Sequence, residues 1–91
     1  MAFEIRYHPY VKSIDLPLIN EKIKKRIKAA IETRLTEVPH HYGEPLRKTL
    51  KGYWKLRVGD YRIVFKIKGN FIFILGIIHR KKVYEKIGTR T

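Results

Sequence analysis

The stretch LKGYWKLRVGDYRIVFKIKGNFIFILGIIHRKKVY, residues 50–84, contains two runs in which apolar and cationic residues alternate, followed by a third that is mostly apolar. Alternation with a period of two is typical of strands that bury one face. Gly59-Asp60 and Gly69-Asn70 separate the runs and favour tight turns. The stretch therefore predicts three consecutive antiparallel strands. We expect them over residues 52–58, 61–68 and 71–80.

The third run, FIFILGIIHR, is apolar on both of its sides, which is typical of a central strand covered on two faces. Its outer face must be covered by the C-terminal segment of the chain or by a bound partner. That segment, KKVYEKIGTRT over residues 81–91, is expected to form one helical turn that Gly88 ends.

The N-terminal part of the chain predicts one strand and one long helix. AFEIRY, residues 2–7, alternates as a strand does, and Pro9 should end it. Asp15 is expected to cap a helix whose first turn contains Pro17 and which Pro39 ends, a length of about five turns. Its apolar stripe recurs at spacings of three and four residues. The stripe comprises Ile19, Ile23, Ile27, Ala30, Ile31, Leu35 and Val38.

Residues 39–52 contain two prolines and two glycines and are predicted to form a loop. Together these elements predict one small α+β domain over residues 1–91, with a mainly antiparallel four-stranded sheet and N-terminal helices packed on one face. His40 and His41 adjoin in the loop without a third ligand nearby, so we expect no metal site and no cofactor.

The composition points to an anionic partner. The 91 residues include 21 lysines and arginines against 8 acidic residues, a formal net charge of +13, yet 44% are hydrophobic, which excludes a disordered basic tail. Nucleic acid is the leading candidate, ahead of acidic membranes and acidic proteins. The absence of cysteine favours a cytoplasmic location. The longest apolar run has eight residues, far fewer than the roughly 20 that span a bilayer.

Cations on neighbouring predicted strands suggest a phosphate site. Lys55, Arg57 and Arg62, with Arg80 after the last strand, are expected to converge on one open face of the sheet. Such groups orient a phosphodiester and stabilise the negative charge that develops during attack on phosphorus. The alternative is that they form only a soluble outer face.

A metal-dependent nuclease would need clustered carboxylates, but from residue 53 onward the chain offers only Asp60 and Glu85. RNA supplies its own nucleophile, the 2′-hydroxyl, so its cleavage requires only positioning, charge stabilisation and proton transfer. Candidates for the proton transfers are Tyr84, His79, Lys55 and Arg80. These residues therefore suffice chemically for a metal-free ribonuclease.

Two segments, PLRKTLKGYWKLRVGDYRIVFKI and IIHRKKVYEKI, carry a family resemblance that extends over the entire chain. Leu50-Lys51-Gly52, residues 56–62, His79-Arg80 and Tyr84, at this spacing, resemble the RelE/ParE superfamily of toxin–antitoxin toxins. The resemblance implies a RelE-like fold. It also implies a messenger-RNA interferase that enters the ribosomal A site and cuts by 2′-hydroxyl attack, leaving a 2′,3′-cyclic phosphate.

The resemblance assigns roles to four residues. Lys55 corresponds to a basic strand residue implicated in proton transfer, and Arg62 to the arginine that stabilises the phosphate. Arg80 corresponds to the arginine after the last strand, and Tyr84 to the C-terminal catalytic tyrosine.

This chain departs from RelE at Tyr53, where RelE has a second lysine. Arg57 and His79 are the candidates to compensate for that lysine. We rank Arg57, His79 and Tyr53 as RNA-binding candidates below the four catalytic ones.

The resemblance also implies a cognate antitoxin, acidic in the segment that binds the toxin, and a complex that binds operator DNA through the antitoxin. Messenger RNA and the ribosome are the other implied partners, and no membrane is. A ParE-like inhibitor of DNA gyrase is the first alternative, although Arg62, Arg80 and Tyr84 together favour RelE-like chemistry. A catalytically inactive binding module with the same fold is the second.

Overall fold

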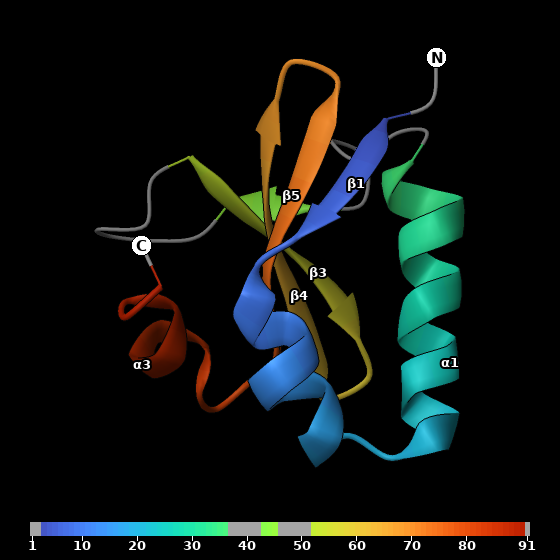
Figure 1. Ribbon diagram of the computed structural model, residues 1–91, viewed down its shortest axis with the longest axis vertical. Helices are drawn as coiled ribbons and strands as arrows, with labels where there is room; N and C mark the ends of the chain where they lie inside the picture. The colour runs from blue at the N-terminus through green and yellow to red at the C-terminus, as the bar shows by residue number, and fades with distance from the viewer. Residues whose placement is uncertain (1–2, 37–42, 46–51, 91) are drawn as a thin grey trace.

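The computed structural model describes residues 3–36, 43–45 and 52–90, and a five-stranded sheet forms its centre (Figure 1). The strands are β1 (Glu4–Tyr7), β2 (Glu44–Pro45), β3 (Tyr53–Val58), β4 (Tyr61–Lys68) and β5 (Phe71–His79). They lie in the order β1-β5-β4-β3-β2. β1 is parallel to β5, and every other neighbouring pair is antiparallel.

The predicted run of three antiparallel strands, β3 to β5, is confirmed. Gly59 and Gly69 take φ values of +59° and +60° in the two connecting turns. This left-handed conformation suits glycine and brings antiparallel strands back on themselves tightly.

The predicted count of four strands is wrong by one, because Glu44 and Pro45 inside the predicted loop pair with β3 as an edge strand. Proline is tolerated there, since an edge strand needs hydrogen bonds on one side only. Most of that loop, including His40 and His41, lies outside the described residues.

The predicted long helix is divided, and Asp15 does not cap it. The chain first forms two short helical segments, after which Ile19 is extended, with φ −114° and ψ 134°. Asn20 caps the main helix instead, since its side-chain oxygen accepts a hydrogen bond from the Ile23 amide at 2.9 Å. These elements are η1 (Val11–Asp15), η2 (Leu16–Leu18), α1 (Glu21–Ala30) and its wider final turn η3 (Ile31–Leu35). The predicted end at Val38 and Pro39 lies outside the described residues.

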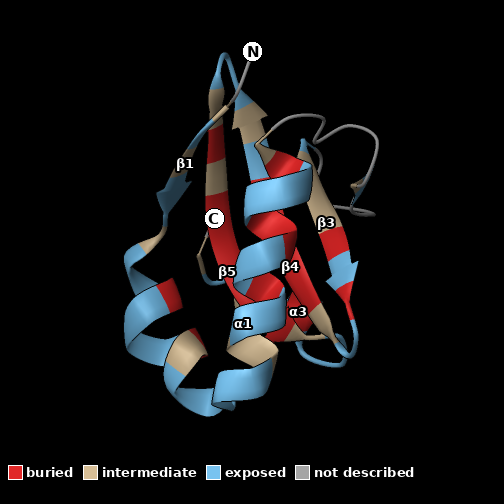
Figure 2. Ribbon diagram, turned by 90° about the vertical axis from the view of Figure 1, so that its right-hand side faces the viewer, coloured by how far each residue is buried: buried red, intermediate tan, exposed pale blue. Residues whose placement is uncertain are grey.

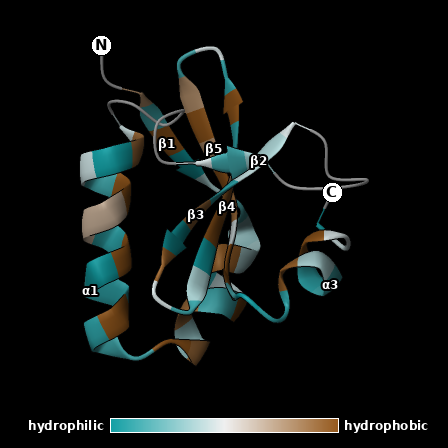
Figure 3. Cartoon of the chain, turned by 180° about the vertical axis from the view of Figure 1, so that it is seen from behind, coloured by the Kyte–Doolittle hydropathy of each residue, from teal (hydrophilic) through white to brown (hydrophobic). Residues whose placement is uncertain are grey.

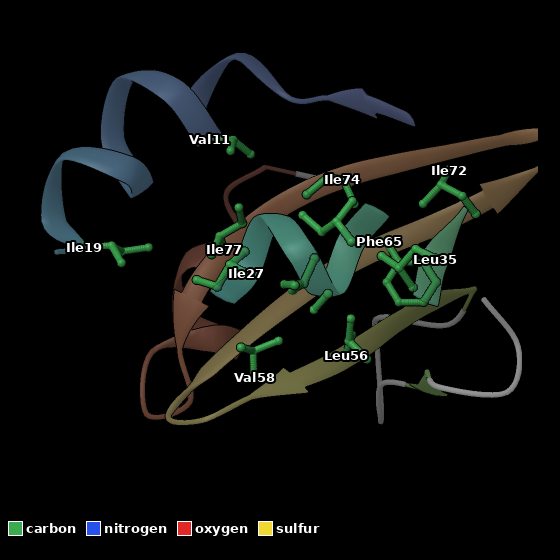
Figure 4. Close-up of a cluster of buried hydrophobic side chains, with 13 residues drawn as sticks. Val11, Ile19, Ile27, Leu35, Leu56, Val58, Phe65, Ile72, Ile74 and Ile77 are labelled. Atoms are coloured by element: carbon green, nitrogen blue, oxygen red, sulfur yellow. The ribbon is translucent and has the colours of Figure 1, made fainter. Parts of the chain in front are cut away.

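The predicted apolar stripe, which runs from Ile19 through α1 and η3, packs on one face of the sheet and forms the main core (Figures 2 and 4). From the stripe, Ile19, Ile27, Ala30, Ile31 and Leu35 are buried. From the strands, the main core takes Leu56, Val58, Ile63, Phe65, Ile72, Ile74 and Ile77. The polar side of α1 is exposed to solvent (Figure 3).

A smaller core lies on the other face of the sheet. Val64, Leu75 and Ile78 of the strands pack there against Val83 and Ile87 of the short C-terminal helix α3 (Val83–Ile87). The C-terminal segment of the chain therefore covers the outer face of β5, as the first of the two alternatives predicted. No helix in the described residues is long and apolar enough to cross a membrane.

Candidate functional site

Three cations lie on the face of the sheet that carries α3. Leu56 and Val58 of β3 are buried in the main core, so the alternation of a strand directs Lys55 and Arg57 to the opposite face. Arg62 of β4 is the register partner of Arg57 and therefore lies on that face as well.

The position of Arg62 is fixed by its own turn. Its side chain is only 8% exposed, and one terminal nitrogen, Nη1, donates to the carbonyl oxygens of Gly59 and Tyr61, both at 3.0 Å. These two bonds occupy one end of the guanidinium. The group is thus oriented before any ligand arrives.

The charges around Arg62 are unbalanced. Burial lowers the pKa of its guanidinium, and the nearby positive charges of Arg57 and Arg80 lower it further, while Asp60 and Glu44 raise it. Arg57 and Arg80 each have a larger influence on this pKa than either carboxylate, so the neighbouring cations repel Arg62 more than the two carboxylates attract it. Because arginine stays protonated in proteins, this repulsion persists at neutral pH and would be relieved by a bound anion.

A cavity of about 120 Å³ opens beside these cations. One ordered water needs roughly 10–15 Å³ of such space, so the cavity admits a considerably larger group. It is lined by Lys55, Leu56, Arg57, Arg62, Arg34 and Glu44.

Sequence reasoning missed Arg34 and Glu44 as lining residues. Arg34 falls within the predicted helix but not in its apolar stripe, and Glu44 falls in the predicted loop. The register of β2, which places Glu44 opposite Lys55, is what brings the carboxylate to the cavity. Proline next to Glu44 hid that strand from a search for alternating patterns.

Arg80 lies at the end of the sheet where the β3–β4 turn is found. Its amide donates to the Asp60 carbonyl at 2.8 Å, and its Nε lies 3.9 Å from Asp60 Oδ1. Both side chains are exposed, so this ion pair adds little stability. Arg80 is still near enough to Arg62 for its positive charge to lower the pKa of Arg62.

Tyr84 projects from α3, and its side chain is 46% exposed. Its helix neighbours Val83 and Ile87 pack against Val64, which belongs to the same sheet face as Arg62. The structure therefore brings Lys55 and Arg62 into one cavity, Arg80 into electrostatic range of Arg62, and Tyr84 onto the same face.

The two remaining candidates, Tyr53 and His79, do not line the cavity. Tyr53 is half-buried against the smaller core, with Lys66 Nζ 5.5 Å from its ring centroid. His79 is the register partner of Tyr61, whose ring packs against the main core and lies 5.7 Å from the His79 ring. The structure thus directs His79 to the opposite face from Arg62.

A β-bulge explains the position of His79. The register steps from Phe65–Ile74 to Val64–Gly76, so Leu75 is an extra residue in β5. Strict alternation would direct His79 to the same face as Phe73, which packs against the smaller core. One inserted residue reverses the alternation beyond it.

Within residues 3–36, 43–45 and 52–90, no three histidine, aspartate or glutamate side chains gather as a candidate metal site. What these residues do offer is positive charge around a small cavity, with a phenol on the same face. Such an arrangement can bind a phosphodiester and stabilise added negative charge.

Residues 5–84 match the family model of the ParE toxin of the type II toxin–antitoxin system, parDE. The chain is 38% identical over 86 residues to Toxin RelE of Mycobacterium tuberculosis, covering 86% of this chain and 89% of that protein. It is 34% identical over 74 residues to Toxin RelE3 of Methanocaldococcus jannaschii, covering 78% of this chain and 84% of that protein.

Solved structures agree with these sequence matches. A chain of the toxin–antitoxin complex RelBE2 from Mycobacterium tuberculosis superposes with a TM-score of 0.80 and 26% identity, over 88% of this chain and 100% of that one. A chain of the RelB–RelE complex from Methanococcus jannaschii gives a TM-score of 0.64, also at 26% identity, over 89% of this chain and 96% of that one.

Proposed function

The chain belongs to the RelE/ParE superfamily of type II toxin–antitoxin toxins, and from that membership we propose that it is a metal-independent endoribonuclease that cleaves messenger RNA in the ribosomal A site. One observation carries the proposal. Lys55 and Arg62 line the same cavity, and the positive charges of Arg57 and Arg80 lie close enough to act on Arg62.

The scissile phosphate occupies this cavity in the proposed reaction. The 2′-oxygen attacks phosphorus, the bond from phosphorus to the 5′-oxygen breaks, and a 2′,3′-cyclic phosphate remains on one product. Arg62 stabilises the charge that develops on the phosphate oxygens. Because its turn carbonyls already orient it, little reorganisation opposes the reaction.

Two proton transfers accompany the displacement. The 2′-hydroxyl loses a proton as it attacks, and the departing 5′-oxygen gains one. Lys55 and Tyr84 are the residues proposed for these transfers, one acting as acceptor and the other as donor. Arg80 contributes charge at the edge of the site.

The proposed partner that silences the toxin is an antitoxin with an acidic binding segment, through which the complex would also bind operator DNA. Support comes from the net charge of +13 and from an apolar groove of about 460 Å³ between α1 and the N-terminal helical turns. The apolar lining includes Val11, Leu16, Ile27 and Ile31, and the charged lining comprises Lys12, Lys24 and Lys28 with one acidic residue, Glu32. An amphipathic segment with acidic flanks complements this surface.

A ParE-like inhibitor of DNA gyrase is the second candidate, favoured by the family model that the chain matches. The test is to induce the protein, map transcript 5′ ends and assay gyrase supercoiling in the same cells. Cleavage within translated codons, lost in Lys55→Ala and retained in the exposed helix variant Lys25→Ala, supports the ribonuclease. Intact transcripts with inhibited supercoiling support the gyrase inhibitor, and neither effect favours an inactive binding module.

A further inference from the structure

A buried ion pair joins the C-terminal end of the described chain to its N-terminal helical turns. Arg90 Nη2 lies 2.7 Å from Asp15 Oδ1, and Arg90 Nη1 lies 2.7 Å from Asp15 Oδ2. The two side chains are 3% and 1% exposed. Two parallel bonds between a guanidinium and a carboxylate fix orientation as well as distance.

The pair is also bonded to the middle of β5. The Ile77 amide donates to Asp15 Oδ2 at 2.9 Å, and Arg90 Nη1 donates to the Leu75 carbonyl at 3.0 Å. Leu75 is the extra residue of the β-bulge, so the pair is attached where the ladder is interrupted. Buried charges that have these additional partners form a rigid, specific connection, and removing one charge leaves the other unpaired.

Gly76 provides the space for this connection. A Cβ atom at this position would lie 2.7 Å from Arg90 Nη1 and 2.7 Å from Ile78 Cδ1, closer than real Cβ contacts allow. Glycine normally weakens the interior of a strand and often marks a close approach of another group. Here the group is the guanidinium of Arg90.

The helix that carries Tyr84 depends on such a connection. α3 spans only Val83–Ile87, and no side chain caps its start at Lys82. Helices this short are unstable alone in water, so α3 needs contacts that hold it on the sheet. Val83 and Ile87 supply apolar contacts, and the Arg90 amide, which donates to the Ile87 carbonyl at 2.9 Å, links the helix to the ion pair.

We propose that Asp15 and Arg90 are positioning residues that hold α3 on the sheet and thereby keep Tyr84 on the face that carries the phosphate cavity, an inference that rests on the proposed ribonuclease function. Neither residue touches the RNA. Their effect on cleavage passes through Tyr84.

A double-mutant cycle tests this dependence, with single-turnover cleavage of messenger RNA on programmed ribosomes as the measurement. Arg90→Gln should lower the rate constant by about 100-fold, the loss expected when a reacting group shifts by about 1 Å. In the Tyr84→Phe background the same substitution should have no further effect.

Equal losses in both backgrounds would overturn the proposal, since they would indicate general destabilisation. The exposed Arg6→Gln, which removes the solvent-accessible pair with Glu4, is the matched control.

The double variant Asp15→Asn/Arg90→Gln separates positioning from stability. Losing one charge leaves its buried partner unpaired, whereas losing both removes that penalty. The double variant should therefore regain most of the melting temperature lost in Arg90→Gln, while its cleavage rate stays low. A rate that recovers together with the melting temperature would contradict a positioning role.

Hydrogen exchange distinguishes failure of this inference from failure of the proposed function. In Arg90→Gln, backbone amides of residues 84–90 should exchange faster, while amides of β4 keep the protection of the wild type. Unchanged exchange in residues 84–90 would overturn the positioning role whatever the protein cleaves. Absence of cleavage by the wild type, with faster exchange in the variant, would overturn the ribonuclease and retain the anchoring of α3.

Discussion

The two faces of the sheet differ in what they bury. The face under α1 is covered by a continuous apolar core that includes the fully buried side chains of Phe65 and Leu35. The face under α3 has a small core beside a cluster of cations, with Arg62 buried among them. The difference indicates that one face stabilises the fold, while the other gives up part of its apolar contact to hold charge close together.

The largest effect should come from opening the main core. Phe65→Ala removes a side chain with no exposed surface and should lower the free energy of unfolding by about 3–5 kcal/mol. Urea unfolding followed by circular dichroism measures this change. A loss below 1 kcal/mol would contradict the assignment of the α1 face as the main source of stability.

On the face under α3, a substitution should change the cleavage rate and leave the stability of the fold nearly unchanged. Tyr84→Phe removes one hydroxyl from an exposed side chain, so the unfolding free energy should stay within about 0.5 kcal/mol of the wild type. Cleavage of ribosome-bound messenger RNA should fall about 10²- to 10⁴-fold, as expected for the loss of a proton-transfer group.

The control is Tyr7→Phe, because Tyr7 is similarly exposed, at 50%, and belongs to β1, at the opposite edge of the sheet from β2. It should cleave at the rate of the wild type. Equal losses in the two variants would remove the special role of the Tyr84 hydroxyl.

An anion should stabilise the cationic face. Phosphate bound near Arg62 relieves the repulsion that lowers its pKa, so the free energy of unfolding should rise by about 1.4 kcal/mol at ten times the dissociation constant. Thermal unfolding in increasing phosphate, with chloride at matched ionic strength as the control, measures the gain. Lys55→Gln should reduce it, and identical stabilisation by chloride would argue against a specific site.

The smallest effect concerns two arginines directly opposite each other on β3 and β4. Arg57→Gln removes one member of the pair with Arg62, and like charges at such positions destabilise a sheet. The variant should be more stable than the wild type by about 0.2–1 kcal/mol, most clearly at low salt. A variant less stable than the wild type would indicate that Arg57 makes a compensating contact.

Local patterns in the sequence were enough to predict the run of three strands and the clustering of Lys55, Arg57 and Arg62, because alternation within a strand decides which face each side chain takes. Pairings between distant segments were not predictable in this way. β1 and β2 form the two edges of the sheet, and each pairs with a strand that is distant in the sequence or follows a long loop. No local sequence pattern predicts such pairings.

The structure departs from the local sequence pattern at two further residues, Asp15 and His79. Asp15 has the residue type of a helix cap, but a buried Arg90 engages its carboxylate, and Asn20 caps α1 instead. His79 was predicted from its place in the sequence, but the bulge at Leu75 reverses the alternation of β5 and directs His79 to the other face. A glycine inside an otherwise apolar strand, Gly76, was the available signal for both.

The attachment of Arg62 to the carbonyls of Gly59 and Tyr61 has a consequence for genetic selection. Among cells that survive induction of the toxin, escape alleles at codon 62 should encode chains that proteases remove, because they lose a buried side chain and both hydrogen bonds that tie it to the β3–β4 turn. Escape alleles at codon 84 should instead encode full-length chains that accumulate, since that side chain is exposed. Immunoblots of such survivors would distinguish the two classes of allele by the amount of full-length protein, without an assay of RNA.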